Sequence, residues 1–290
     1  MNAIEKYLAS HISTSGNIRL TSVGGGSIND TYRVMVNENP SFFLKVNSVS
    51  KFPGLFEKEK NGIEFLSRPN LIRVPSVISC DIHEDCQFLL LEWIASGTRD
   101  GNFWKKFGEQ LAKLHLITDE TFGFHEDNYM GSLSQINAPT TTWIDFFTTY
   151  RLRPQVDLAV KKNLLEKPHV DGFEMLYAKL DSIFNVEKPS LLHGDLWSGN
   201  FMCDEQSSPV LIDPAVYFGH RSIDLAMTTL FGGFDKSFYE SYDHHYAFPS
   251  GYRDQWDISN LYPLLIHLNL FGQSYLADIL HTLKRFTATK

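Results

Sequence analysis

The stretch that decides the fold is Leu191–Asn200, which reads LLHGDLWSGN and precedes an aspartate, Asp213, a short distance downstream. Two apolar residues run into His-Gly-Asp, and Asn200 follows Asp195 five positions later. A second short apolar run, residues 210–212, ends at Asp213. Because short apolar runs of this kind are typical of buried strands, three oxygen-bearing side chains are expected at the ends of two strands.

These side chains are the groups that phosphoryl transfer with Mg²⁺ requires. One carboxylate accepts a hydroxyl proton, and an amide and a second carboxylate hold hard cations. The spacing H-x-D-x-x-x-x-N matches the catalytic loop of kinases, which makes Asp195 the candidate base and Asn200 and Asp213 the candidate metal ligands. The alternative is an ordinary polar turn between two strands, and the choice depends on partners elsewhere in the chain.

Composition limits the class of protein. The 290 residues are 43% hydrophobic and 21% charged, as in a soluble globular protein with one large domain or two lobes. A formal net charge of -8 argues against a nucleic-acid partner, because no basic stripe is present to neutralise phosphates. Cys80, Cys86 and Cys203 predict free thiols in a reducing compartment. With no signal peptide or membrane-spanning stretch in the sequence, we expect a cytoplasmic protein without a membrane partner.

A glycine-rich turn lies between two predicted strands near the N-terminus. Residues 18–23 alternate apolar and polar side chains, run into Gly24-Gly25-Gly26-Ser27, and are followed by a second strand-like run over 31–36. Loops of this form fold over nucleotide phosphates because glycine lets backbone N–H groups approach an anion. No Gly-Lys-Ser/Thr follows, so the turn is not a Walker A loop, and a plain hairpin is the alternative.

A lysine and a glutamate downstream are predicted to form an ion pair. Lys45 lies inside a short apolar strand, and Glu59 lies in the middle of the apolar face of a helix predicted over 52–66. A carboxylate there is costly to bury unless a cation meets it, and Lys45 is the natural partner. The pair matches the strand lysine and helix glutamate of kinases, in which the lysine contacts the α- and β-phosphates.

The next stretch predicts the boundary between two lobes. Two further strands are expected over 73–79 and 87–91, after which Glu92-Trp93-Ile94 leads into a connector of small residues. In a kinase this connector is the hinge whose backbone binds adenine. We therefore predict an N-terminal nucleotide-binding lobe over 1–94 and a catalytic and substrate-binding lobe over 95–290. In the second lobe, helices are expected over 103–115, 143–159, 170–184, 262–271 and 275–286.

Seven motifs in this order carry a resemblance to a known family. They are GGGSIND at the glycine turn, FLK at Lys45, FxxExxGIxxL at 56–66, TFGFHEDNY at 121–129, HGDLWSGN at 193–200, DLAM at 224–227 and HLNLFG at 267–272. The chain resembles the fructosamine kinase (ketosamine-3-kinase) family over about residues 23–272. That family belongs to the aminoglycoside-phosphotransferase-like branch of the protein-kinase-like fold. The resemblance implies an α+β, bilobal fold with a small antiparallel-sheet lobe, one main helix in it, and a larger, mainly helical lobe.

The resemblance also implies an activity. Members are ATP- and Mg²⁺-dependent kinases of the 3-hydroxyl of ketoamines, the ribulosamine, erythrulosamine or fructosamine adducts of amines, including protein lysines. Phosphorylation of this kind leads to deglycation. The family's phosphate loop often has cysteine where this chain has Ser27, which puts in doubt any redox control through the loop.

Further residues take roles from the same resemblance. Asp224 is expected to brace the catalytic loop through its backbone amides, with His193 in a supporting structural role. Trp197 is expected either to lie against a sugar face or to pack under the loop. The segment 121–137 is either a substrate loop or a surface excursion, and its candidate substrate contacts are His125, Asp127 and Asn128.

Two other functions compete with this one. The first is a kinase of another small alcohol, such as an aminoglycoside, choline or homoserine. The second is a pseudokinase that binds nucleotide, which is disfavoured because Lys45, Glu59, Asp195, Asn200 and Asp213 are all present.

Overall fold

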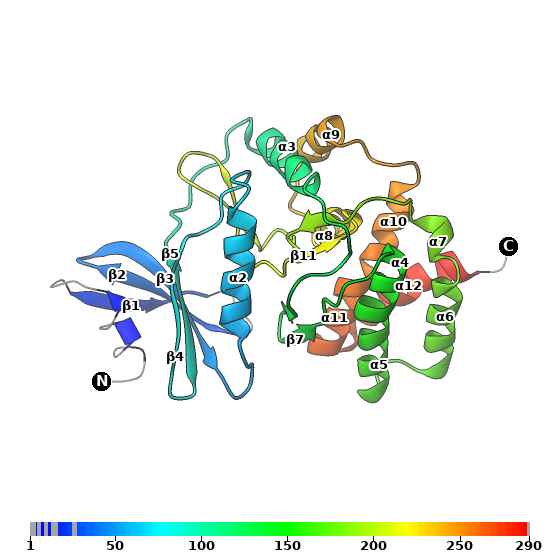
Figure 1. The fold of residues 1–290 in the computed structure, drawn as a ribbon, viewed down its shortest axis with the longest axis horizontal. Helices are drawn as coiled ribbons and strands as arrows, with labels where there is room; N and C mark the ends of the chain where they lie inside the picture. The colour runs from blue at the N-terminus through cyan, green and yellow to red at the C-terminus, as the bar shows by residue number, and fades with distance from the viewer. Residues whose placement is uncertain (1–3, 5–6, 9–10, 13–16, 25–27, 289–290) are drawn as a thin grey trace. The chain divides into compact units, whose positions relative to one another are not determined.

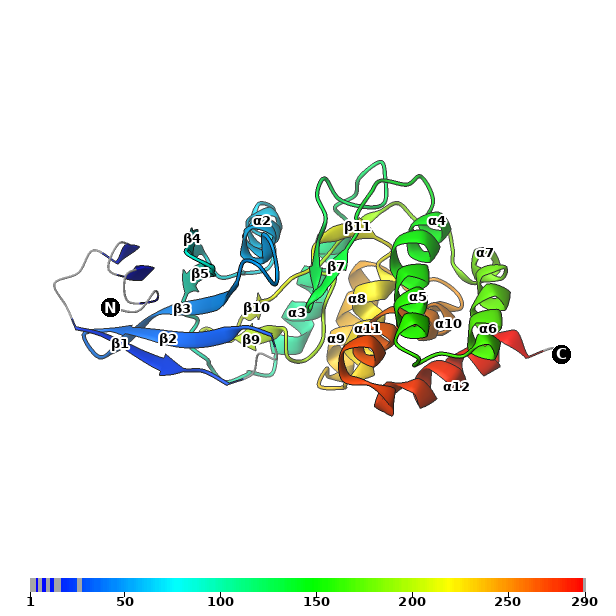
Figure 2. The ribbon, with the colours of Figure 1, turned by 90° about the horizontal axis from the view of Figure 1, so that it is seen from below.

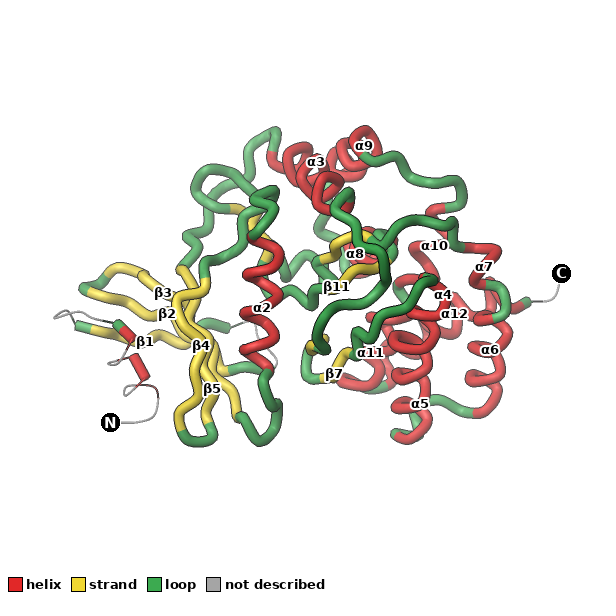
Figure 3. The backbone as a smooth tube through the Cα atoms, in the orientation of Figure 1, coloured by secondary structure: helices red, strands yellow, loops and turns green. Residues whose placement is uncertain are grey.

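The chain forms two units, one built on a sheet and one built mainly from helices (Figures 1 and 3). The structure is a computed structural model that describes residues 4, 7–8, 11–12, 17–24 and 28–288. The first unit contains Met1–Phe103 and Met202–Pro214, and the second contains Trp104–Phe201 and Ala215–Lys290. The predicted lobe boundary after Ile94 stays a prediction.

The first unit is a five-stranded antiparallel sheet. Its order is β1 (Ile18–Ser22), β2 (Asp30–Val36), β3 (Asn39–Ser48), β5 (Cys86–Glu92) and β4 (Val77–His83). The hairpin between β2 and β3 turns at Asn37 and Glu38, which both have positive φ angles (51° and 66°), as the tightest hairpin turns require. The segment 202–214 adds β9 (Phe201–Cys203), which pairs with β10 (Pro209–Leu211).

Helix α2 (Leu55–Ser67) packs against β4 and β5 on one face of this sheet (Figure 2). It begins after Gly54, whose positive φ of 70° lets the chain turn into the helix. On β3, Leu44 and Val46 belong to the hydrophobic cluster that also contains Tyr7. Since side chains alternate along a strand, Lys45 between them faces the side that α2 covers.

The second unit is mainly helical. Its helices are α3 (Phe103–His115), α4 (Trp143–Phe147), η1 (Thr148–Leu152), α5 (Arg153–Lys161), α6 (Lys167–Tyr177), α7 (Leu180–Ile183), α8 (Ser222–Leu230), α9 (Lys236–His245), α10 (Tyr252–Ser259), α11 (Leu261–Phe271), η2 (Gln273–Tyr275) and α12 (Leu276–Thr287). Two short antiparallel pairs join them, β6 (Asn128–Met130) with β7 (Leu133–Gln135) and β8 (Ser190–Leu192) with β11 (Tyr217–Gly219). None of the helices in the described part of the chain is both long and apolar enough to cross a membrane.

The core of this unit is built around α11, which is apolar on nearly every side and therefore buried. Helices α5 and α12 pack against it (Figure 2). The predicted helices over 103–115, 262–271 and 275–286 are confirmed within a residue or two. The helix predicted over 143–159 is present as α4, η1 and α5 in succession, with a π-helical turn in its middle.

The π-helical turn carries a fully buried arginine, Arg151. Its guanidinium donates hydrogen bonds to the carbonyl oxygens of Ile136 and Tyr150 and to Oδ1 of Asn137, at 2.7, 3.0 and 2.6 Å. It also lies 4.1 Å from the ring centroid of Tyr217. Arg151 thus joins the segment after β7 to β11, the strand that pairs with β8.

Candidate active site

Strand β8 delivers the residues His193, Gly194 and Asp195. The strand is fully buried and pairs with β11, with Leu192 opposite Tyr217. Gly194 follows with a φ of +84°, and a Cβ at this position would lie 2.0 Å from the carbonyl oxygen of Ala215. Only glycine allows this close approach of the two backbone segments, so the G of HGD is required by the geometry of the turn.

Asp224 on α8 holds the backbone of this turn. Its Oδ2 accepts a hydrogen bond from His193 N at 2.8 Å, and its Oδ1 accepts one from Gly194 N at 2.9 Å. The carboxylate is fully buried and also meets Nε2 of His115 at 3.2 Å. His115 Nδ1 in turn lies 2.8 Å from the hydroxyl of Tyr242. A buried carboxylate is tolerated here because several donors satisfy it.

Asp195 is held by its own loop. Asn200 Nδ2 donates to the backbone oxygen of Asp195 at 2.8 Å and to its Oδ2 at 2.9 Å. Asp195 N donates to Nδ1 of His193 at 3.2 Å, so the buried imidazole supports the loop from beneath. With both amide protons of Asn200 directed at Asp195, its Oδ1 is the atom suited to meet a cation.

In the first unit, Lys45 joins two carboxylates. Its Nζ lies 2.6 Å from Glu59 Oε1 and 2.7 Å from Asp213 Oδ1. The lysine side chain is buried and that of Glu59 is 12% exposed, whereas that of Asp213 is 47% exposed. The Lys45–Glu59 ion pair predicted from the sequence is therefore present. Asp213 has a φ of 54°, a left-handed conformation that costs energy for a residue with a Cβ.

Burial and charge act in opposite directions on this cluster. Burial alone would lower the pKa of the Lys45 ammonium, but Asp213 and Glu59 more than offset it and raise that pKa above its usual value. Burial raises the pKa of the Glu59 carboxyl, although Lys45 opposes the rise. The lysine is thus held firmly in its charged form, ready to meet anionic oxygens.

The side chains of the predicted hinge residues contact other residues of the first unit. Glu92 accepts hydrogen bonds from Arg73 and from the backbone and hydroxyl of Ser76. The Arg33 guanidinium lies over the Trp93 ring at 5.5 Å, and Ile94 is buried. Adenine recognition by a hinge uses backbone groups, so these contacts leave the prediction open.

The glycine-rich turn is only partly within the described residues. Gly24 is exposed, with no atom within 4 Å of the position of a Cβ. Gly25, Gly26 and Ser27 lie outside the described residues.

The three predicted substrate contacts in segment 121–137 occupy different environments. Asn128 is buried; it donates to the carbonyl of Val216 at 2.8 Å and accepts from Gln135 Nε2 at 2.8 Å and Asn137 Nδ2 at 3.0 Å. Asp127 Oδ1 accepts from Asn137 N at 2.8 Å. The side chain of His125 is 61% exposed, and Asp127 is exposed as well. The substrate roles of all three residues stay predictions.

Trp197 lies two residues after Asp195 and is half-buried against the helical core. Its ring folds back over the loop, so that a Cβ at Gly199 would lie 2.3 Å from it. The other side of the loop meets Gly233, where a Cβ would lie 2.6 Å from Ser198 Cβ. The ring therefore both packs in the loop and remains partly accessible, which is compatible with either role predicted for it.

Sequence reasoning missed two buried polar groups that support the site. His115 ends the helix predicted over 103–115, and its contact with Asp224 was not foreseen. Arg151 was missed altogether, because an arginine within an amphipathic helical run ordinarily faces solvent. No local signal distinguishes a buried arginine from an exposed one.

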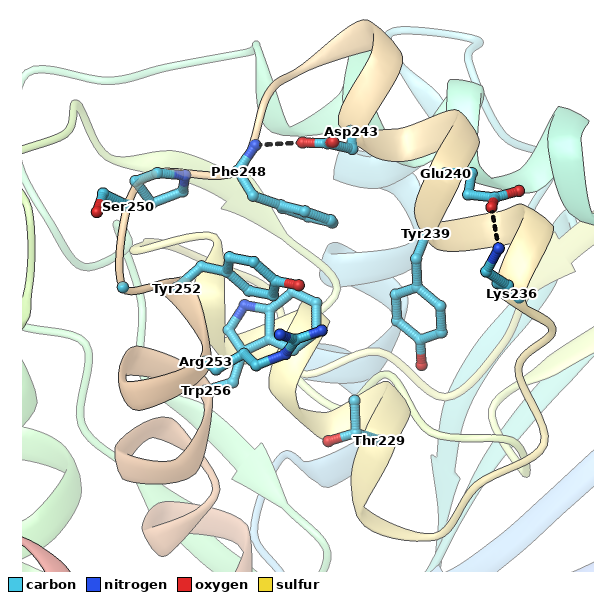
Figure 4. Close-up of a pocket in the computed structure, with 12 residues that line it drawn as sticks. Thr229, Lys236, Tyr239, Glu240, Asp243, Phe248, Ser250, Tyr252, Arg253 and Trp256 are labelled. Carbon is cyan, nitrogen blue, oxygen red and sulfur yellow. Dashed lines mark hydrogen bonds and ion pairs between the residues drawn. The ribbon is translucent and has the colours of Figure 1, made fainter.

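A separate cavity of about 630 Å³ lies between α9 and α10 (Figure 4). The rings of Tyr239, Phe248, Tyr252 and Trp256 line it, together with charged side chains such as Arg253. None of the predicted site residues is part of its lining.

Few side chains near the candidate site could coordinate a metal ion. In the described part of the chain, no group of three or more His, Cys, Asp and Glu side chains is placed to hold a metal ion. The Asp213 carboxylate and the Asn200 amide oxygen are, however, the hard ligands that Mg²⁺ prefers, and Mg²⁺ usually completes its shell with waters and substrate phosphates. The chemistry of these two donors, Asp213 in the first unit and Asn200 in the second, therefore suits Mg²⁺.

Comparison with solved structures first defines the class of protein. The structure of an aminoglycoside phosphotransferase, APH(2")-IIa with gentamicin, matches with a TM-score of 0.63 at 16% identity, covering 100% of this chain and 97% of that one. The five-stranded antiparallel sheet and the helical remainder thus belong to a protein-kinase-like, α+β fold, as predicted.

A family model then identifies the particular group. The fructosamine kinase family model matches residues 1–289, and the chain belongs to this family. A protein of Enterococcus faecium named "Probable ketoamine kinase" is 38% identical over 272 residues, covering 93% of this chain and 96% of that one. The chloroplastic protein-ribulosamine 3-kinase of Arabidopsis thaliana is 36% identical over 261 residues, covering 89% and 79%. A crystal structure of a Thermobifida fusca protein assigned as a fructosamine-3-kinase matches with a TM-score of 0.87 at 30% identity, covering 99% of each chain.

Proposed function

We propose that the protein is an ATP-dependent kinase that phosphorylates the 3-hydroxyl of ketoamines, the sugar adducts of amines. The observation that carries the proposal is Asp195, whose carboxylate is fixed by Asn200 and whose loop backbone is fixed by Asp224, in a chain that the fructosamine kinase family spans almost completely. The relatives named ketoamine kinase and protein-ribulosamine 3-kinase support ketoamines as the substrate class. The Arabidopsis name supports protein-bound ribulosamines among them.

In this proposal Asp195 accepts the proton of the attacking hydroxyl and orients its oxygen toward the γ-phosphorus. Lys45, kept charged by Glu59, contacts the α- and β-phosphates of ATP, and the backbone of Gly24–Ser27 covers them. Asn200 and Asp213 would hold Mg²⁺, which when bound neutralises charge on the phosphate oxygens. Most of the rate enhancement then comes from positioning and charge neutralisation, since phosphoryl transfer requires little covalent help from the protein.

The location proposed for this activity is the cytoplasm. Cys80, Cys86 and Cys203 are all free thiols in the structure, and free thiols persist in reducing compartments.

The experiment that tests the function is a coupled ADP-release assay with ATP and Mg²⁺ over a panel of acceptors. We expect turnover with a ribulosamine or fructosamine and little with choline, homoserine or an aminoglycoside. A higher turnover of choline, homoserine or an aminoglycoside would show that the substrate is that alcohol and not a ketoamine. Absence of turnover with every member, while nucleotide still binds, would make the protein a pseudokinase.

Lys45→Met is expected to destabilise the fold by about 3–5 kcal/mol, because it leaves the buried Glu59 without its cation. Burial makes the folded state bind a proton on Glu59 more tightly than the unfolded state does. The loss of unfolding free energy in Lys45→Met should therefore be smaller at pH 5 than at pH 8. At pH 8 the Glu59 carboxyl is ionised in the unfolded state, so folding must either bury its charge or take up a proton.

Urea denaturation at both pH values measures the free energy of unfolding. Lys60→Met removes a more exposed lysine of α2, the helix that carries Glu59. Its Nζ lies 3.8 Å from Glu64, and the variant serves as the matched control with little expected change. An unfolding free energy of Lys45→Met equal to that of the control would contradict the prediction.

A further inference from the structure

Five aromatic rings in the second unit form a continuous strip that begins beside the candidate base. We define the aromatic strip as Trp197, Phe231, His267, Phe271 and Tyr275. Ring centroids are 5.7 Å apart for Trp197 and Phe231, 5.1 Å for Phe231 and His267, 5.5 Å for His267 and Phe271, and 5.0 Å for His267 and Tyr275. Trp197 is two residues from Asp195, so one end of the strip adjoins the catalytic loop.

Three local features of the sequence place these rings next to one another. Phe231 is the C-cap residue that follows α8, and the two positive-φ glycines after it, Gly232 and Gly233, turn the chain back against the loop at Ser198. His267 and Phe271 are four residues apart on α11, so they lie on one face of that helix. Tyr275 follows in η2.

Two rings of the strip are exposed to solvent. Phe231 and Phe271 are 40% and 53% exposed, and they are the only exposed phenylalanines in the described part of the chain. The other 20 of the 22 phenylalanines are buried or half-buried. Leaving two large rings in water is costly in hydrophobic free energy, and exposed rings that belong to one contiguous aromatic strip mark a binding surface.

The strip carries no charge of its own. His267 Nδ1 lies 2.7 Å from the carbonyl oxygen of Pro263, which assigns the ring proton to Nδ1. Burial lowers the pKa of His267, so the ring is neutral near pH 7. An uncharged aromatic surface favours carbon chains and, through the ring faces, cationic amines.

We propose that the aromatic strip beyond Trp197, through Phe231, Phe271 and Tyr275, binds the substituent on the nitrogen of the ketoamine. This inference rests on the proposed function. A ketoamine has its sugar on one side of a secondary amine and the carbon chain of the original amine on the other. With the sugar hydroxyl at Asp195, the nitrogen and its substituent must leave the loop, and the strip offers a continuous apolar path. Adducts of amines with long carbon chains, such as the lysine side chain, are therefore preferred over adducts of short polar amines.

The test compares two acceptors that differ only in this substituent, the ribulose adducts of hexylamine and of ethanolamine. The wild-type protein should have the higher kcat/KM for the hexylamine adduct. Phe271→Ala should lower the ratio of the two kcat/KM values about 10-fold, the size of effect that a few methylene contacts produce. Phe231→Ala should act in the same direction.

Leu116→Ala is the matched control, since Leu116 is also 53% exposed but belongs to no part of the strip, and its ratio should equal that of the wild type. The proposal would be overturned if the ratio of the two kcat/KM values were unchanged in both phenylalanine variants, including the case in which kcat/KM falls equally for both adducts. Absence of turnover of either adduct by the wild-type protein would instead reject the ketoamine function itself.

Discussion

Asp195→Asn is expected to abolish nearly all phosphoryl transfer while nucleotide binding stays close to that of the wild type. General-base catalysis contributes about 10²–10⁴-fold to a rate, and asparagine cannot accept the hydroxyl proton. The loop should keep its shape, because the side-chain oxygen of asparagine can still accept the hydrogen bond that Asn200 Nδ2 donates to Asp195 Oδ2.

Turnover is measured by ADP release with the best ketoamine, and nucleotide affinity by titration calorimetry. Asp171→Asn is the matched control, since Asp171 is an exposed residue of α6 paired with Lys167, and it should leave both quantities unchanged. ADP release by Asp195→Asn at the wild-type rate would show that another group takes the proton.

Asp224→Asn is expected to lower kcat by about 10²-fold, since a displacement of about 1 Å at a reacting group has an effect of that size. The Asp224 carboxylate accepts hydrogen bonds from two successive backbone N–H groups, one on each oxygen. An asparagine has a single acceptor oxygen, so its NH₂ group would face a backbone N–H, donor against donor. The turn must then shift, and Asp195, the next residue, shifts with it.

A readout beyond loss of activity separates this positioning role from general destabilisation. We expect kcat to fall in Asp224→Asn while the KM for ATP changes little, because Lys45 and Glu59 belong to the other unit. The matched comparison is Thr228→Val, which removes a buried hydroxyl of the same helix and should lower stability without a comparable change in kcat. Equal kcat values in the two variants would contradict a positioning role for Asp224.

Much of the fold followed from local sequence patterns. Alternation and short apolar runs predicted strands in the first unit, although the strand expected over 73–79 lies at Val77–His83. Apolar periodicity predicted most of the helices, because these signals lie within a few residues of one another. The antiparallel sheet itself was implied by the family resemblance. The contact between Lys45 and Glu59 was also predictable, since a buried carboxylate on an apolar helix face requires a nearby cation.

The parts that could not be predicted depend on contacts between distant segments. The grouping of Met202–Pro214 with the first unit depends on non-local pairing such as that of Arg73 with Asp204, 131 residues apart. The burial of Asn128 depends on a carbonyl 88 residues away, that of Val216. Neither relation leaves a periodic signal in the sequence around it.

The buried arginine of the π-helical turn has a consequence for how this chain can diverge. No carboxylate in the described part of the chain lies within ion-pair distance of Arg151, and backbone oxygens, the Asn137 amide and the Tyr217 ring take that place. A planar guanidinium satisfies this set of acceptors and ring faces, whereas the compact ammonium of lysine does not. Substitutions at positions 137, 151 and 217 are therefore expected to occur together in related chains, and a single exchange at any one of them to be rare.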